Sequence, residues 1–149
     1  MLDKTRRFQA ENAFAEGIGE QLTPVALSAA WYLVLVPPVE VSTAAVFAAP
    51  ELTRDTKPIR ITAFFEGLER RALRNDLEPV VSKRYPEVAH HLAWLKQHGE
   101  ARMSGSGACV YAEFSTQSEA RAAHARLPQA MRGFVVRGLE RHPLHGLTS

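Results

Sequence analysis

The chain has 149 residues, of which 46% are hydrophobic and 23% charged, and this composition is ordinary for one soluble globular domain. Its formal net charge of +2 is too small to indicate a nucleic-acid partner, and its single cysteine, Cys109, allows no internal disulfide. The longest apolar run, residues 31–38, is too short to span a bilayer, and no apolar region follows the charged first residues as in a secretory signal. We therefore expect a cytoplasmic protein without a membrane partner.

The first predicted elements lie between residues 13 and 58. Residues 13–20 alternate briefly and then break at two glycines, which predicts a strand that enters a turn. Residues 31–36 are aromatic and β-branched and are stopped by two prolines, so they predict a buried strand. Ser42 or Thr43 can cap a short helix that runs through Phe47. A loop is expected after it.

Helical periodicity dominates the middle of the chain. Residues 60–73 predict one helix, and a second apolar stripe steps by three and four residues through Leu77, Val81, Tyr85, Val88, Leu92 and Leu95. Asn75 or Asp76 is expected to cap this second helix, and Gly99 to end it. Pro86 removes one intrahelical hydrogen bond, so it should kink the helix or start a new segment.

The last third predicts two strands, a helix and a final strand. Residues 102–104 and 108–114 read as strands, Ser115 or Thr116 as a helix cap, and residues 134–136 as the last strand. From residue 31 onward the predicted order is one strand, helices, two strands, a helix and a strand. That order predicts an α+β fold of the ferredoxin-like split βαβ type, an antiparallel sheet with helices on one face.

Two glycines and two serines lie between the predicted strands, and we call residues 104–107 the glycine-serine turn. Glycine reaches backbone angles closed to other residues, and it lets a ligand approach the main chain. Backbone N–H groups gathered in such a turn can bind an anion, and the hydroxyls of Ser104 and Ser106 can donate or accept. A tight connection that needs glycine only for its angles explains the same residues, so both interpretations stay open.

Several segments, in order, resemble the GHMP kinases and, within them, the kinases of 4-diphosphocytidyl-2-C-methyl-D-erythritol. These segments are residues 13–20 with 22–24, 31–34, 42–47, 50–56, 102–114 and 143–145. The resemblance covers residues 13–146 and implies that residues 29–149 form the C-terminal domain of a GHMP kinase. It implies that residues 1–28 are a strand and turn from the edge of the N-terminal kinase domain.

The resemblance also implies substrate contacts. Phe47 matches the aromatic residue that stacks on the cytosine ring, although a core phenylalanine at a helix end explains it equally well. Ile18 matches a residue that lines the substrate pocket, and Thr43 is expected to make a polar contact or a cap. Three residues of the glycine-serine turn should face the substrate and its phosphates: Gly105, Ser106 and Gly107.

Catalysis in these kinases uses an aspartate base, ATP and Mg²⁺ to phosphorylate a tertiary alcohol of cytidine-diphospho-methylerythritol, in the isoprenoid precursor pathway. Asp3 falls at the place of that aspartate, but its neighbours do not match, and residues 1–10 can also be unrelated sequence. The family's lysine-bearing strand and its Gly/Ser-rich loop around the ATP phosphates have no counterpart here. The chain by itself is therefore expected to be an inactive C-terminal half, whose partner is the missing N-terminal half or a second copy.

The sequence leaves two other interpretations open. One is a non-catalytic ferredoxin-like module that binds a nucleotide-linked metabolite, and the other is a poorly folding remnant without function. No metal site is expected, because the histidines do not fall into a recognised ligand motif.

Overall fold

The computed structural model describes residues 12–25, 30–57 and 74–140. The predicted helix at residues 60–73, Asp3 and the segment 143–145 lie outside these ranges. The chain divides into two compact units, one made of residues 1–29 with 138–149 and the other of Ala30–Arg137. None of the helices in the described ranges combines the length and apolar character that crossing a bilayer requires.

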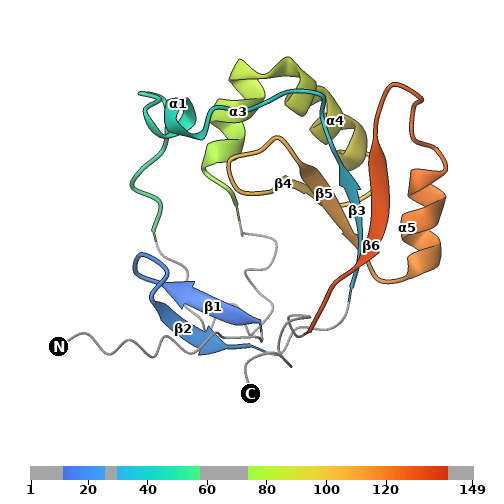
Figure 1. Ribbon diagram of the computed structural model, residues 1–149, viewed down its shortest axis with the longest axis horizontal. Helices are drawn as coiled ribbons and strands as arrows, with labels where there is room; N and C mark the ends of the chain where they lie inside the picture. The colour runs from blue at the N-terminus through green and yellow to red at the C-terminus, as the bar shows by residue number, and fades with distance from the viewer. Residues whose placement is uncertain (1–11, 26–29, 58–73, 141–149) are drawn as a thin grey trace. The chain divides into compact units, whose positions relative to one another are not determined.

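The smaller unit contains a β-hairpin. Strands β1 (Ala13–Glu16) and β2 (Gln21–Pro24) pair antiparallel, with Glu16 opposite Gln21 (Figure 1). The four residues between them form the turn, and its two glycines have φ angles of +69° at Gly17 and +93° at Gly19, which other residues rarely adopt. The predicted strand and turn are confirmed.

The larger unit is built on a four-stranded antiparallel sheet. Its strands are β3 (Trp31–Leu35), β4 (Ala101–Met103), β5 (Val110–Phe114) and β6 (Gly133–Arg137). Their order in the sheet is β4-β5-β3-β6, so the first strand of this unit lies between the third and the fourth (Figure 1). This is the strand order of the ferredoxin-like split βαβ arrangement, and it confirms the predicted fold.

Four helices are described in this unit: α1 (Thr43–Phe47), α3 (Leu77–Arg84), α4 (Pro86–Lys96) and α5 (Gln117–His124). The predicted break at Pro86 is confirmed, since α3 ends before Tyr85 and Pro86 is the first residue of α4. A proline fits there because its missing N–H is not needed in a first turn. Thr116, rather than Ser115, caps α5.

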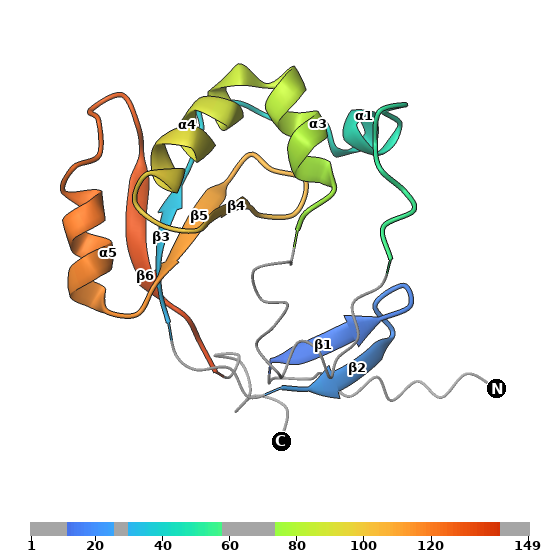
Figure 2. The ribbon, with the colours of Figure 1, turned by 180° about the vertical axis from the view of Figure 1, so that it is seen from behind.

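The core lies between one face of the sheet and the helices (Figure 2). Leu33 and Leu35 of β3 and Val110 and Ala112 of β5 are fully buried on that face, whereas the residues between them stay half-exposed or exposed. The period of two along each strand produces this difference. The helices contribute the other buried side chains, among them Val46, Val80, Val81, Val88 and Leu95.

The strand ends around the glycine-serine turn differ from the prediction by one or two residues. β4 ends at Met103 rather than at Ser104, and β5 begins at Val110 rather than at residue 108. The reason is that the N–H of Ser104 donates to the carbonyl of Cys109 at 2.9 Å, so the residues between them close the turn. Cys109 therefore lies just before β5, outside the strand in which the pattern placed it, and is half-exposed.

Candidate functional site

Helix α1 carries two of the predicted site residues, and it is too short to be stable by itself. The Ser42 hydroxyl accepts a hydrogen bond from the N–H of Ala45 at 3.3 Å, which satisfies one open donor of the first turn. The N–H of Ser42 donates to the hydroxyl oxygen of Tyr85 at 3.2 Å. Val46 is fully buried in the core. The helix is thus held by a local cap and by tertiary contacts.

Arg84 of α3 joins that helix to the rest of the unit. Its Nε and Nη2 donate to the two carboxylate oxygens of Glu51 at 2.9 and 3.0 Å, and its Nη1 donates to the carbonyl of Ala45 at 3.3 Å. Two parallel bonds of this kind fix direction as well as distance. The hydrogen bonds from Arg84 lower the pKa of the Glu51 carboxyl, and Glu51 raises the pKa of Arg84 in return.

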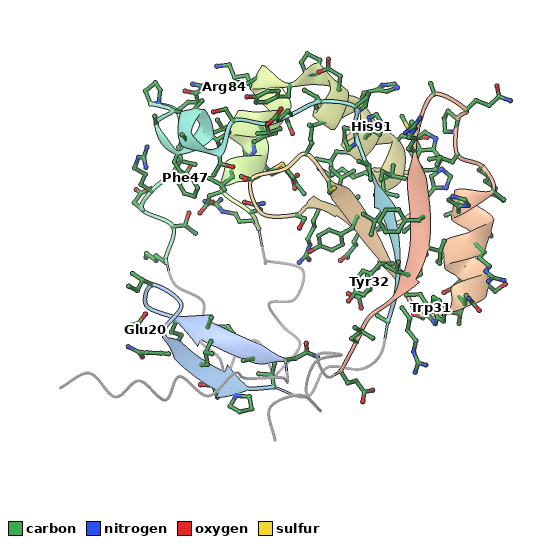
Figure 3. All side chains as sticks on the ribbon, viewed as in Figure 1. Glu20, Trp31, Tyr32, Phe47, Arg84 and His91 are labelled. Atoms are coloured by element: carbon green, nitrogen blue, oxygen red, sulfur yellow. The ribbon has the colours of Figure 1, made fainter. Side chains whose placement is uncertain are left out.

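Arg54 holds the end of α1. Its Nη2 donates to the carbonyl of Phe47 at 2.6 Å and to that of Ala49 at 3.3 Å. A cation is favourable there because the last carbonyls of a helix lack intrahelical donors. The Phe47 side chain itself is 53% exposed, so its large apolar ring is not part of the core (Figure 3). The interpretation of Phe47 as a core residue is therefore wrong.

The glycine-serine turn has the conformation for which its glycines are required. Gly105 and Gly107 have φ angles of +53° and +88°. The N–H of Gly107 donates to the carbonyl of Ser104 at 2.9 Å. A Cβ atom at Gly107 would meet the sulfur of Met103 at 3.1 Å, so this position is restricted by space as well as by backbone angle. The tight turn leaves Gly105 exposed and Ser106 half-exposed.

The turn and α1 meet through a pair of hydroxyls. Thr43 Oγ1 and Ser106 Oγ lie 2.8 Å apart, a hydrogen bond between residues 63 positions apart in the chain. Thr43 and Phe47 are four residues apart on one helix, so they share a face. The structure therefore brings together, at one place on the larger unit, two hydroxyls, the two glycines of the turn and an exposed aromatic ring. We call Thr43, Phe47 and the glycine-serine turn the α1 site.

Ile18, another of the predicted site residues, belongs to the unit that contains the hairpin. It is 99% exposed at the tip of the hairpin, in the smaller unit. The Glu20 carboxylate accepts a hydrogen bond from the N–H of Ile18 at 2.6 Å. Backbone hydrogen bonds, from Glu20 itself and then from Ile18, lower the pKa of Glu20. The predicted contact of Ile18 with a substrate stays a prediction, as does the role of Asp3.

His, Cys, Asp and Glu are the side chains that could bind a metal near the α1 site. The described ranges contain no group of three or more His, Cys, Asp or Glu side chains that could hold a metal ion. His91, labelled in Figure 3, is buried, and its Nδ1 lies 2.7 Å from the carbonyl of Glu87 on the preceding turn of α4. Because a carbonyl only accepts, that ring nitrogen carries the proton. His91 is a core residue.

A hollow of about 380 Å³ lies elsewhere, beside the start of α3 and strand β4. It is lined by three cations, Arg74, Lys96 and Arg102, and by three carboxylates, Asp76, Glu78 and Glu100. Each cation lies within 4 Å of one of these carboxylates, at 2.8, 3.2 and 3.9 Å. None of the predicted site residues lines the hollow, so it carries no functional assignment.

Three residues that organise the α1 site were not predicted as such: Arg54, Arg84 and Asn75. Asn75 or Asp76 was expected only as a helix cap; Asp76 takes the N-cap position without a side-chain cap bond, and Asn75 Oδ1 accepts from the N–H of Leu77 at 3.1 Å. Its amide also contacts the glycine-serine turn. The partners of Arg84 and Asn75 lie some 30 residues away in the chain, so no local spacing points to them.

Comparison with known proteins now decides the family. The model of the family described as "GHMP kinases C terminal" matches residues 53–133. The chain belongs to the GHMP kinase family. The match spans the helices α3, α4 and α5 and the whole glycine-serine turn, and it confirms the resemblance seen in the sequence.

Curated relatives give a closer comparison. A 4-diphosphocytidyl-2-C-methyl-D-erythritol kinase of Thiobacillus denitrificans is 58% identical over 135 residues, which are 91% of this chain and 47% of the relative. The kinase of the same name from Nitrosospira multiformis is 60% identical over 139 residues, 91% of this chain and 46% of the relative. The chain thus spans about half the length of the curated relatives that it matches.

A solved structure agrees with these relatives. The crystal structure of a 4-(cytidine 5'-diphospho)-2C-methyl-D-erythritol kinase superposes with a TM-score of 0.70 at 27% sequence identity. The superposition covers 85% of this chain and 49% of that chain. The GHMP kinase fold is therefore supported by the strand order, the family match and a solved relative.

Proposed function

We propose that this chain is the substrate-side half of a kinase that phosphorylates 4-diphosphocytidyl-2-C-methyl-D-erythritol, a step in isoprenoid precursor synthesis. The observation that carries the proposal is the hydrogen bond between Thr43 and Ser106, which places the glycine-serine turn beside the helix that presents Phe47. The names of the similar proteins support the choice of substrate. The residues of the α1 site supply groups that suit each part of it.

Phe47 would stack on the cytosine ring. An exposed aromatic ring is a sequence-tolerant platform for a base, and such stacking is typically worth about 1–3 kcal/mol per base. The two bonds from Arg54 and the buried neighbour Val46 fix the end of α1 on which the ring stands. A platform held in this way loses little conformational freedom when the base binds.

The hydroxyls and the turn would face the polar part of the substrate. Thr43 and Ser106 can each donate and accept, so one hydroxyl can bond the other while it contacts a substrate oxygen. Gly105 and Gly107 let the substrate approach the main chain where a side chain would block it. These residues would bind and orient, and positioning is the main requirement in phosphoryl transfer.

The reaction itself needs groups beyond the α1 site. In it, the alcohol oxygen of the substrate bonds to the γ-phosphorus of ATP, the bond from that phosphorus to the bridging oxygen breaks, and ADP leaves. A base takes the alcohol proton, and we propose Asp3 for it on its place in the sequence. Mg²⁺ accompanies ATP in this chemistry. Because Mg²⁺ is commonly held by one or two carboxylates together with the phosphates of ATP, its protein ligands would lie where ATP binds.

The domain assignment belongs to the same proposal. Residues 29–149 would be the C-terminal domain of the kinase, and residues 1–28 a strand and turn from the edge of its N-terminal domain. The start of the larger compact unit at Ala30 supports the boundary near residue 29, whereas residues 138–149 group with the unit that contains the hairpin β1–β2. The N-terminal half of the kinase would be the partner that supplies the ATP site.

Calorimetric titration of the purified chain with cytidine-diphospho-methylerythritol tests the proposal. We expect binding, and we expect Phe47→Ala to weaken it roughly tenfold or more, since a stacked base is lost. Phe134→Ala is the matched control, because Phe134 on β6 is 49% exposed against 53% for Phe47 and lies outside the α1 site. An affinity of Phe47→Ala equal to that of the control, or no binding by the wild-type chain, would reject the proposal.

A coupled assay with ATP, Mg²⁺ and the same substrate gives the second readout. No turnover is expected from the chain alone, and turnover is expected after addition of the N-terminal half of a relative. Turnover by the chain alone would contradict its assignment as the substrate-side half. Binding without turnover in the mixed sample would favour a non-catalytic binding module instead.

A further inference from the structure

Strand β4 is an edge strand, and its outward backbone groups at Met103 are bonded by side chains instead of by another strand. The N–H of Met103 donates to Glu78 Oε2 at 3.0 Å, and its carbonyl accepts from Asn75 Nδ2 at 3.1 Å. Both side chains come from the start of α3. The N-terminal end of α3 therefore takes the place of a neighbouring strand at Met103, the last residue of β4 before the glycine-serine turn.

Asn75 makes a further contact inside the turn. Its Nδ2 also donates to the carbonyl of Gly105 at 2.6 Å, while its Oδ1 accepts from the N–H of Leu77 at 3.1 Å. A neutral primary amide offers two donors and an acceptor on one rigid plane, and all three positions are used here. One side chain thus links two carbonyls, on either side of Ser104, to the first turn of α3.

We propose that Asn75 is a positioning residue, which holds the glycine-serine turn in the shape that binds substrate. The proposal rests on the proposed function, because it names the turn as a substrate contact. Because the carbonyls of Met103 and Gly105 are held, the backbone at Gly105, which has a positive φ angle, keeps one orientation. In this orientation Ser106 Oγ lies 2.8 Å from Thr43 Oγ1. Asn75 acts through the turn and does not itself touch the substrate.

The variant Asn75→Asp isolates this role. Aspartate keeps an oxygen that can accept from the N–H of Leu77, so the bond to the first turn of α3 is retained. It loses both donors and puts a carboxylate oxygen against two carbonyl oxygens, so the turn should move while α3 stays formed. Thr116→Ala is the matched control, because it removes a helix cap at α5 and leaves the turn unchanged.

Two readouts on the 149-residue chain test the proposal. The first is the set of backbone amide chemical shifts of Gly105, Ser106 and Gly107 without ligand, which we expect to change in Asn75→Asp and to stay constant in Thr116→Ala. The second is the affinity for cytidine-diphospho-methylerythritol, which we expect to fall roughly tenfold in Asn75→Asp and to stay within twofold of wild type in the control. Thermal unfolding of both variants shows how much of the change is general destabilisation.

The outcomes separate this proposal from the proposed function. The positioning role would be overturned if the amide chemical shifts of the turn were unchanged in Asn75→Asp. It would also be overturned if Asn75→Asp lost no more affinity than Thr116→Ala at the same unfolding temperature. If the wild-type chain does not bind the ligand at all, the proposed function fails. Changed turn shifts would in that case support Asn75 as the residue that orders the turn and reject the ligand.

Discussion

Helices α1 and α5 are both short and both begin with a hydroxyl cap, but they are stabilised in different ways. α5 has a capping box, in which the Thr116 hydroxyl accepts from the N–H of Glu119 while the Glu119 carboxylate accepts from the N–H of Thr116. It also has an acidic residue in its first turn and basic residues in its last. α1 has a cap at Ser42 but no charged residue in either end turn.

The missing local support of α1 is replaced by contacts from distant residues. Arg84 and Arg54 donate to two carbonyls of α1 and to the carbonyl of Ala49 just beyond it, and Thr43 bonds the glycine-serine turn. Both helices need packing against the unit, but α5 has more local support, whereas the position of α1 depends on contacts from distant residues. We infer that the α1 site depends on these contacts, so single substitutions there should disturb binding more than folding.

The largest expected effect comes from Gly107→Val in the turn. The φ angle of +88° and the sulfur of Met103 at 3.1 Å from an added Cβ leave no room for valine. We expect the free energy of unfolding to fall by about 3 kcal/mol and binding of cytidine-diphospho-methylerythritol to be lost. Urea denaturation and calorimetry measure the two effects, and wild-type affinity in this variant would contradict the account of the turn.

Removing the cap of α5 should lower the stability of the chain without changing its affinity for the substrate. Thr116→Ala breaks the capping box, and such a loss typically costs about 1 kcal/mol of stability. Because α5 contributes no residue to the α1 site, the affinity for the substrate should not change. A parallel loss of affinity, measured in the same titration, would mean that the two ends of the unit are coupled.

Arg84→Lys tests whether the distant contacts of α1 matter for substrate binding. Lysine keeps the charge but cannot donate in parallel to both Glu51 oxygens and to the carbonyl of Ala45. We expect a several-fold loss of substrate affinity with little change in the unfolding midpoint, since this ion pair is on the surface. Lys83→Arg, an exposed neighbour on α3, is the control, and equal affinities of the two variants would contradict the role of Arg84.

The smallest expected effect is a pH dependence of α1. Arg84 makes the pKa of Glu51 lower in the folded chain than its ordinary value of 4.5. The stabilisation is therefore fully present above that value, and it is lost as the pH falls through the lower pKa of the folded state. The difference in stability between wild type and Glu51→Gln should shrink below about pH 4.5 and stay constant above it. A difference that changes instead near neutral pH would rule out this cause.

Sequence patterns predicted the elements whose signals are local. The apolar run at residues 31–36 predicted β3, Pro86 predicted the break between α3 and α4, and the choice of Ser115 or Thr116 as a cap predicted the start of α5. The pattern could not separate the strands from the closing residues of the turn, because the bond from Ser104 to Cys109 exists only once both strands are paired.

The α1 site was predicted in part. Thr43, Phe47 and Ser106 were named through resemblance to the family, and the structure brings Thr43 and Ser106 into contact. Its supports were not found, because Asn75 reaches Gly105 across 30 positions and Arg84 reaches Glu51 across 33. Contacts at such separations follow from how the helices pack on the sheet and leave no periodic signal in the sequence.

The most direct measurement is an amide chemical-shift titration of the ¹⁵N-labelled chain with cytidine-diphospho-methylerythritol. The account predicts that the shifts which change on binding gather in α1 and the glycine-serine turn, with α5 unaffected. Changes gathered on α5 or on the charged hollow beside β4, or no changes at millimolar ligand, would contradict the assignment of the α1 site as a substrate site.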